Sequence, residues 1–131
     1  MSLTAPNTST VPVEWIGDLS PTLVLDEDIV VRLWLVRNAI GQEMLAYLAD
    51  EQPGEDWIVL SPAGPNLVAS LQDGTLPLRD ALTATWMWLV RRTHEGTLSA
   101  WSVDAATLGD LHLPRLGARL LWQHVRRPGV D

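Results

Sequence analysis

The feature that most constrains the fold is a series of short apolar segments separated by turn residues. The clearest covers residues 29–36, where β-branched and large apolar side chains dominate, a composition typical of a β-strand. Further segments of this kind lie at residues 43–49, 57–60, 85–90 and 97–103. The chain is therefore predicted to build a β-sheet, with any helices packed onto it.

The connections between these segments predict antiparallel pairing. The first contains Asn38 and Gly41, two residue types that adopt a positive φ readily. The second centres on Pro53 and Gly54, and a later one ends at Gly96. Connections this short join neighbouring antiparallel strands as hairpins.

Two short helices are predicted in the middle of the chain. Pro65 suits a helix start, because the N–H that proline lacks has no partner there. Leu67 and Leu71 follow at helical spacing, Gly74 can end the helix, and a second helical turn is predicted over residues 78–82. The predicted fold class is α+β: an antiparallel sheet of about five to six strands with one or two short helices packed on one face.

A single globular domain is predicted over residues 13–125. Residues 1–12 are rich in Ser, Thr, Pro and Asn and are predicted as a flexible leader, and residues 126–131 as a tail. Residues 116–122 suit a last strand. One core beneath the first helix is expected to bury Val31, Leu33, Leu35, Ile58, Leu60 and Leu89.

Composition excludes several classes of protein. The chain has no cysteine, which excludes disulfides, thiolate catalysis and cysteine-ligated zinc. The first residues do not have the pattern of a signal peptide, and no run of about 18 apolar residues is long enough to span a membrane. A cytoplasmic location is therefore expected. All positive charges are arginines, and lysine and phenylalanine are absent, a usage that indicates a GC-rich bacterial genome.

The formal net charge of −7 is unevenly distributed. Residues 1–75 hold two arginines and eleven carboxylates, whereas residues 76–131 hold seven arginines and five carboxylates. An acidic protein repels the phosphate backbone, so nucleic-acid binding is disfavoured. A minor alternative is contact with nucleic acid through C-terminal arginines that converge on one face: Arg91, Arg92, Arg115, Arg119, Arg126 and Arg127.

No catalytic, cofactor-binding or metal-binding residue is predicted. His94, His112 and His124 are scattered, without the spacing of a metal site, and each glycine is isolated rather than part of a phosphate-binding loop. The carboxylates of residues 26–28 lack the spacing and the glycine of a calcium loop. They are interpreted as a solvated charge cluster at the end of a strand.

The seven tryptophans are the strongest indication of a binding surface. Trp86 and Trp88 alternate, so in a strand they point to the same face. Trp34 shares a face with Arg32, opposite the purely apolar side chains of its strand. Tryptophan and arginine are enriched in binding hot spots, and the candidate partner-binding residues are Trp34, Arg32, Trp86 and Trp88. The alternative, in which these tryptophans pack in the core, stays open.

Four segments together resemble a family of small bacterial domains of unknown function. They are residues 33–37, residues 46–51, residues 57–61 and residues 75–82, of which Leu78-Arg79-Asp80-Ala81 is the most distinctive part. In that family a hairpin with YLV and VDE precedes a W-L-Y-V-P-I/V-S strand, a helix and a G-x-I/L-x-L-R-D-A segment. Pro77 departs from the polar residue expected there. The resemblance covers roughly residues 17–120 and implies a small stand-alone α+β domain, with no activity attached.

Two functions from different classes follow. The leading one is a non-enzymatic protein-interaction module, such as an adaptor, accessory subunit or immunity-like inhibitor, which needs no cofactor and binds another protein. The alternative is an enzyme whose site combines scattered carboxylates, Arg79 and a histidine. A deep pocket with converging polar groups would favour the enzyme, and an exposed apolar patch would favour the binder. Arg79 is otherwise expected to pair inside the domain, and Asp80 to lie in the first turn of its helix.

Overall fold

A computed structural model describes residues 3–7, 9–27 and 31–119 of the chain. Six strands form one antiparallel sheet in the order β1-β2-β3-β4-β5-β6, so each strand pairs with its neighbour in the sequence. The strands are β1 Leu23–Glu27, β2 Val31–Arg37, β3 Glu43–Gln52, β4 Glu55–Pro62, β5 Met87–Thr93 and β6 Leu98–Val103. The helices are α1 Pro65–Gln72, α2 Leu78–Thr83 and α3 Ala105–Leu108, and the 3₁₀-helices are η1 Val13–Trp15 and η2 Asp110–His112.

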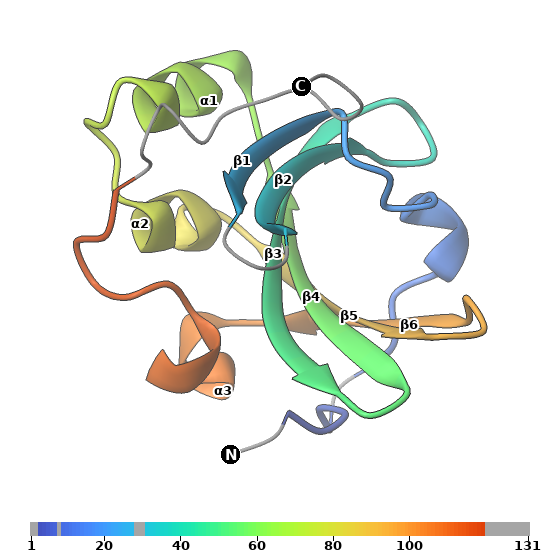
Figure 1. Ribbon diagram of the computed structural model, residues 1–131. Helices are drawn as coiled ribbons and strands as arrows, with labels where there is room; N and C mark the ends of the chain where they lie inside the picture. Colours follow the sequence, from blue (N-terminus) through green and yellow to red (C-terminus); the bar gives the residue numbers. More distant parts are fainter. Residues whose placement is uncertain (1–2, 8, 28–30, 120–131) are drawn as a thin grey trace.

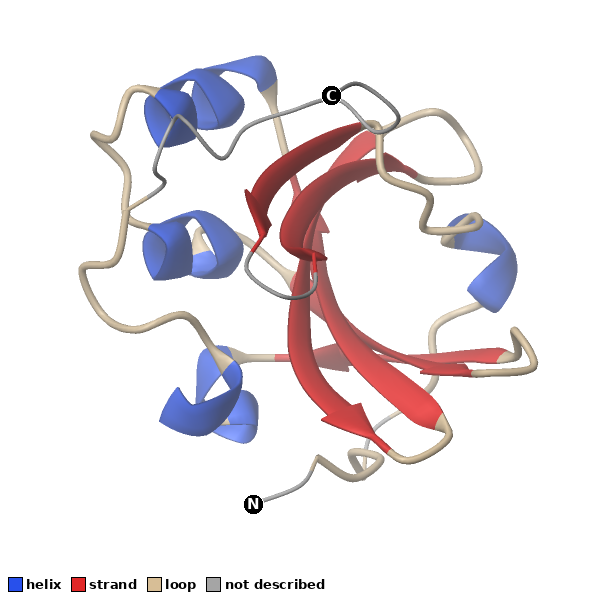
Figure 2. Ribbon diagram, viewed as in Figure 1, coloured by secondary structure: helices blue, strands red, loops and turns tan. Residues whose placement is uncertain are grey.

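The sheet is strongly curved and lies between two layers (Figures 1 and 2). Helices α1, α2 and α3 lie on one side, and η1 lies on the other. This architecture confirms the predicted α+β class with a six-stranded antiparallel sheet. It has three short α-helices on that face instead of one or two.

The face of the sheet toward the α-helices carries the larger core. Leu33, Leu35 and Leu89 of the sheet are buried here, as predicted. Helix α1 contributes Leu71, which is fully buried, and α2 contributes Leu82. The start of α1 at Pro65 agrees with the prediction, because the helix needs no N–H from that residue.

The opposite face of the sheet is also buried, and here the sequence prediction was wrong. Ile58 and Leu60 are fully buried, but in a second core on the η1 side rather than beneath α1. Side chains alternate along a strand, so when Trp57 and Val59 face the helices, their neighbours must face away. The prediction assumed one buried face, whereas a sheet covered on both faces has strands that are apolar throughout.

The N-terminal segment provides the second layer. Ile16 and Leu19 are buried against the sheet, with 0% and 1% of their surface exposed. Part of the segment expected as a flexible leader also contacts the sheet: the Leu3 N–H donates to Asp50 Oδ2 (3.0 Å), and the Val11 N–H donates to the carbonyl of Ala100 in β6 (2.8 Å). Residues 11–19, which we call the covering segment, therefore cover the η1 face of the sheet and part of the outer edge of β6, whereas Leu3 packs in the larger core on the side of the α-helices.

The remaining predictions concern the two ends of the chain. The sequence did not predict strand β1, helix α3 or η1. Residues 116–119 lie in a turn and its exit rather than in the predicted last strand, and residues 120–125 lie outside the described residues. The predicted tail, residues 126–131, lies outside them as well.

Candidate binding surface

Four apolar side chains gather at the surface beside η1, and we call them the tryptophan patch: Trp15, Ile40, Trp86 and Trp88. Trp15 and Trp86 expose 52% and 42% of their surface, and Ile40 exposes 83%. The ring centroids of Trp86 and Trp88 are 4.7 Å apart, and those of Trp15 and Trp88 are 6.4 Å apart. Both pairs are tilted, and the half-buried Trp88 lies between the other two rings.

The sheet positions two of the four residues. Trp86 immediately precedes β5 and Trp88 is its second residue, so both side chains project to the η1 face, as their alternation predicts. Trp88 lies opposite Leu60 of β4 and Ser102 of β6 in the strand register and packs against the second core. Strand pairing on both sides therefore fixes the backbone beneath these rings.

Trp15 reaches the patch from the covering segment. Its carbonyl accepts a hydrogen bond from the Ala39 N–H (3.2 Å), which ties η1 to the turn after β2. Gly17 follows with φ +82°, and a Cβ at this position would lie 3.1 Å from the carbonyl oxygen of Arg37. Only glycine combines that backbone conformation with so close an approach. The position of Trp15 over the sheet therefore depends on Gly17.

Ile40 is held at the tip of the β2–β3 turn by a buried amide. Asn38 Oδ1 accepts hydrogen bonds from the backbone N–H groups of Ile40 (3.2 Å) and Gln42 (2.9 Å). Its Nδ2 donates to Gln42 Oε1 (3.1 Å), and Asn38 is only 8% exposed. A turn fixed by side-chain hydrogen bonds presents an apolar residue to solvent in a defined place.

These elements enclose a shallow recess of about 280 Å³. It is lined by Trp15, Asn38, Ile40, Gln42, Trp86 and Trp88, none of which carries a charge. The two amides already bond to each other, so the recess offers mainly apolar and aromatic contact. Such a surface suits binding by desolvation and ring packing, and it lacks the charged groups that acid–base catalysis requires.

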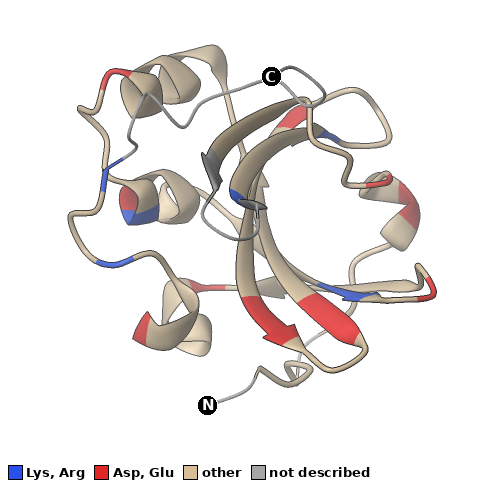
Figure 3. Cartoon of the chain, viewed as in Figure 1, with Lys and Arg blue, Asp and Glu red and all other residues tan. Residues whose placement is uncertain are grey.

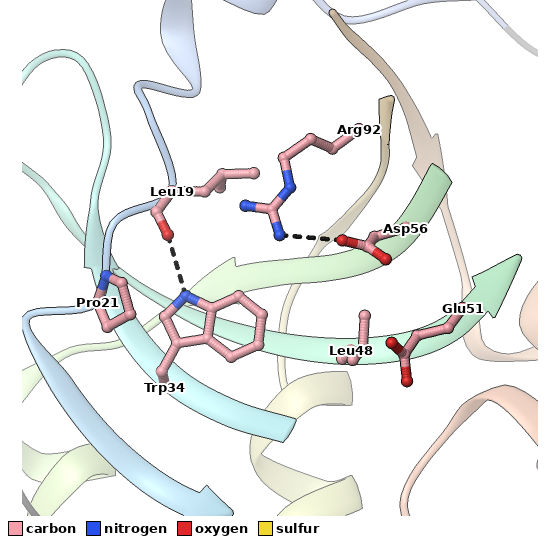
Figure 4. Close-up of a pocket in the computed structure, with 7 residues that line it drawn as sticks. All are labelled: Leu19, Pro21, Trp34, Leu48, Glu51, Asp56 and Arg92. Atoms are coloured by element: carbon pink, nitrogen blue, oxygen red, sulfur yellow. Dashed lines mark hydrogen bonds and ion pairs between the residues drawn. The ribbon is translucent and has the colours of Figure 1, made fainter. Parts of the chain in front are cut away.

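The four residues predicted from the sequence as a binding face are not one surface. Trp86 and Trp88 lie in the patch, but Trp34 is only 4% exposed, and its Nε1 donates to the Leu19 carbonyl (3.2 Å; Figure 4). Trp34 is therefore a core residue, the alternative left open by the sequence, because the covering segment lies over it. Arg32 is exposed beside Glu51 (3.8 Å) in another part of the sheet.

Neither Trp15 nor Ile40 was predicted from the sequence as a binding residue. The sequence does indicate Ile40 as a candidate binding residue, because it lies in a turn between Ala39 and Gly41, where an apolar β-branched side chain gains no stability from burial. The indication for Trp15 is weaker, because this residue follows the presumed leader and precedes Gly17, with no periodicity around it. Its role depends on long-range contacts, which a local pattern does not contain.

A second recess, of about 240 Å³, lies beside Trp34 (Figure 4). Its floor is apolar, and Glu51, Asp56 and Arg92 lie at its rim. The charges there neutralise one another, since Arg92 donates to Asp56 Oδ2 at 3.2 Å and Glu51 lies beside Arg32. This recess therefore offers a ligand no free charged group among these pairs.

The candidate residues of the enzyme hypothesis do not converge. His94 is exposed in the β5–β6 turn, whereas His112 is 8% exposed with Nδ1 3.5 Å from the carbonyl oxygen of Ala49, and His124 lies outside the described residues. As predicted, Arg79 pairs within the domain: its Nε donates to the Pro114 carbonyl (2.7 Å) and its Nη1 to Asp110 (2.8 Å). Asp80 lies in the first turn of α2, also as predicted.

Three of the carboxylates whose pKa is lowered lie at turns and at a helix cap rather than in one pocket. Hydrogen bonds from the Ser20 N–H, the Thr75 hydroxyl and the Thr107 N–H lower the pKa values of the carboxylates that accept them, Asp18, Asp73 and Asp104. Asp104 is the N-cap of α3. Among the described residues no group of three or more His, Asp or Glu side chains is arranged to hold a metal ion.

The arginines of the nucleic-acid hypothesis are divided between separate places (Figure 3). Arg91 and Arg92 of β5 pair with Glu55 (3.9 Å) and Asp56 (3.2 Å) of β4. Arg115 and Arg119 belong to the loop after η2, and Arg126 and Arg127 lie outside the described residues. The described part of the chain therefore presents no continuous basic face.

No family model, curated protein or solved structure compared with this chain matches it. Within the described residues no helix is both long and apolar enough to cross a lipid bilayer.

Proposed function

We propose that this chain is a non-enzymatic protein-interaction module that binds a partner protein through the tryptophan patch. The observation that carries the proposal is the clustering of three tryptophan rings and Ile40, two of the rings about half exposed, around an uncharged recess. A single exposed apolar residue is normal on any protein surface, whereas the largest contiguous apolar patch of a protein is often its binding site.

The construction of the patch supports the same function. Its residues come from three separate segments, each anchored by its own contacts: the covering segment, the β2–β3 turn and strand β5. A partner would therefore meet rings whose backbones are already fixed. Binding then requires little additional ordering of this protein, so less conformational entropy is lost and the affinity is higher. Tryptophan is also among the residues whose truncation at interfaces costs most.

The charge of the chain narrows the class of partner. A net charge of −7 steers a basic partner toward the protein and slows the approach of an acidic one. An adaptor, an accessory subunit or an immunity-like inhibitor of a basic enzyme fits this pattern. Membership in the family of small bacterial domains, and a cytoplasmic location, are part of the same proposal.

The proposal is tested by photo-crosslinking followed by measured affinity. A benzophenone amino acid replaces Ile40 in the full chain, and a control chain carries it at Leu111, which is 73% exposed and lies in η2. We expect a specific adduct in the native host from position 40 and none from position 111.

The captured partner is then purified, and its affinity for Trp86→Ala and Leu111→Ala is compared with that for the wild-type chain. Removal of an anchoring tryptophan commonly costs 2 kcal/mol or more, so we expect about thirtyfold weaker binding for Trp86→Ala, with unchanged binding for Leu111→Ala. A partner that binds Trp86→Ala as tightly as the wild type would contradict the proposal.

A further inference from the structure

The size of the tryptophan patch favours a peptide over a folded partner surface. A tryptophan buries roughly 150–250 Å² in full contact, so the exposed parts of Trp15 and Trp86, together with Ile40, offer on the order of 300 Å². A stable interface between two folded proteins, a second copy of this chain included, buries about 800 Å² on each partner. The patch alone therefore fits a short segment.

Strand pairing is not open to such a segment at this place. Strand β5 already pairs with β4 and β6 on its two sides, and the covering segment bonds to β6 at Ala100. Main-chain hydrogen bonds of the kind formed when a peptide extends a sheet are thus absent from the patch. The segment must bind through its side chains, with its own backbone left in water.

The covering segment, which supplies Trp15 to the patch, carries negative charge. Glu14 belongs to η1 beside Trp15 and has no partner among the described residues, and Asp18 follows on the same segment. Arg37, at the end of β2, lies next to Val36 and so projects to the other face of the sheet, where it donates to the Gly41 carbonyl (3.3 Å). Charge complementarity therefore favours a basic residue beside the apolar part of the segment.

We infer that the patch binds an extended, proline-containing segment of its partner that carries an arginine or lysine next to the prolines. This inference rests on the proposed function. A polyproline II segment has no internal hydrogen bonds, its backbone is fully solvated, and it is already stiff before it binds. It can therefore dock on a small aromatic surface with little loss of entropy, which is how proline-rich peptides bind aromatic-lined grooves in general.

The test uses three fluorescein-labelled dodecapeptides and the full-length chain. The first contains a Pro-x-x-Pro core followed by two arginines, the second has alanine for each proline, and the third has glutamate for each arginine. Fluorescence anisotropy should show saturable binding of the first peptide and at least tenfold weaker binding of the other two. The affinity for the first peptide should decrease as the salt concentration rises. Binding of the first peptide should be about thirtyfold weaker to Trp86→Ala and unchanged for Leu111→Ala.

Glu14→Gln provides a second variant that leaves the rings in place. Glu14→Gln should weaken binding of the first peptide and leave unchanged the binding of a fourth peptide, which has alanine for each arginine. Equal affinity of the wild-type chain for the first and second peptides would overturn the inference. An equal loss of affinity for the first and fourth peptides on Glu14→Gln would overturn it as well.

Failure of the inference and failure of the proposed function give different results. A random dodecapeptide display library is selected against the wild-type chain and counter-selected against Trp86→Ala. Binders that depend on Trp86 but lack proline would overturn the ligand class and leave the interaction function in place. No Trp86-dependent binder, together with no adduct from position 40, would remove both. A dimer in sedimentation that Trp86→Ala dissociates would show that a second copy occupies the patch, which also overturns the inference.

Discussion

Replacement of Ile16 by alanine tests whether the N-terminal segment is an integral layer of the fold. Ile16 follows η1 directly, has 0% of its surface exposed and packs in the core between the covering segment and the sheet. Its N–H donates to the Val13 carbonyl (3.0 Å), a bond that alanine retains. The substitution therefore removes packing and leaves the backbone of the 3₁₀-helix unchanged.

The size of the effect follows from the three carbon atoms that the substitution deletes. At about 0.8 kcal/mol for each buried methylene, their transfer to water costs about 2.4 kcal/mol. The cavity left behind adds to this, and measured losses for such substitutions run from about 2 to 5 kcal/mol. The covering segment is a single chain layer that can relax inward, so we expect a loss of about 2–4 kcal/mol and a decrease in Tm of roughly 6–20 °C.

Urea unfolding followed by circular dichroism measures this loss, and Val13→Ala is the matched control. Val13 lies in the same 3₁₀-helix but is 41% exposed, so its replacement should cost less than about 0.5 kcal/mol. The m-value should be the same for both variants and the wild type. A loss below about 1 kcal/mol for Ile16→Ala, or equal losses for the two variants, would mean that the segment does not form a buried second layer.

Three further outcomes are expected. Leu33→Ala, which removes a side chain only 1% exposed beneath the helices, should lower the free energy of unfolding by about 2–5 kcal/mol in urea titration, and a loss below 1 kcal/mol would contradict its placement. Arg79→Met should lower the free energy of unfolding by about 1–3 kcal/mol, because a charged hydrogen bond to the Pro114 carbonyl is lost. Asp110→Asn should lower it clearly less, because the Asp110 side chain is 88% exposed. Equal losses for the two variants in urea titration would contradict these roles. Burial raises the pKa of Asp50, but hydrogen bonds from Gln52 and the Leu3 N–H outweigh it and hold that pKa below the usual 3.8. The stabilisation is therefore fully present above about pH 4 and is lost as the pH falls through the folded-state pKa, so Asp50→Asn should show a shallower decline of stability in acid, and an unchanged decline would contradict the contact.

The patch and the covering segment depend on each other in this fold. Trp15 reaches the surface only because Ile16 and Leu19 hold their segment on the sheet, while Trp88 contributes both to the second core and to the recess. Ile16→Ala should therefore weaken binding of a partner as well as stability. Val13→Ala, which changes an exposed side chain of the same 3₁₀-helix, should leave both stability and binding nearly unchanged.

Local chemistry accounts for the parts of the fold that the sequence predicted. Residues 43–49 and 57–60 are strands because their apolar side chains fit a pleated surface, and the turn at Gly96 closes because glycine adopts φ +92° without strain. Pro65 begins a helix for an equally local reason. Signals of this kind act within a few residues, so they can be read from the chain directly.

The second buried face, and with it the patch, was decided by the tertiary structure. Nothing near Ile58 shows whether it faces α1 or the N-terminal segment, because an apolar residue in a strand is compatible with either layer. Trp34 and Trp86 are the same residue type in similar apolar stretches of sequence, yet Trp34 is covered and donates to the Leu19 carbonyl while Trp86 remains 42% exposed. Which tryptophan becomes core and which becomes surface depends on where a segment some 15 to 70 residues away comes to rest, and that position is set by the packing of the whole domain.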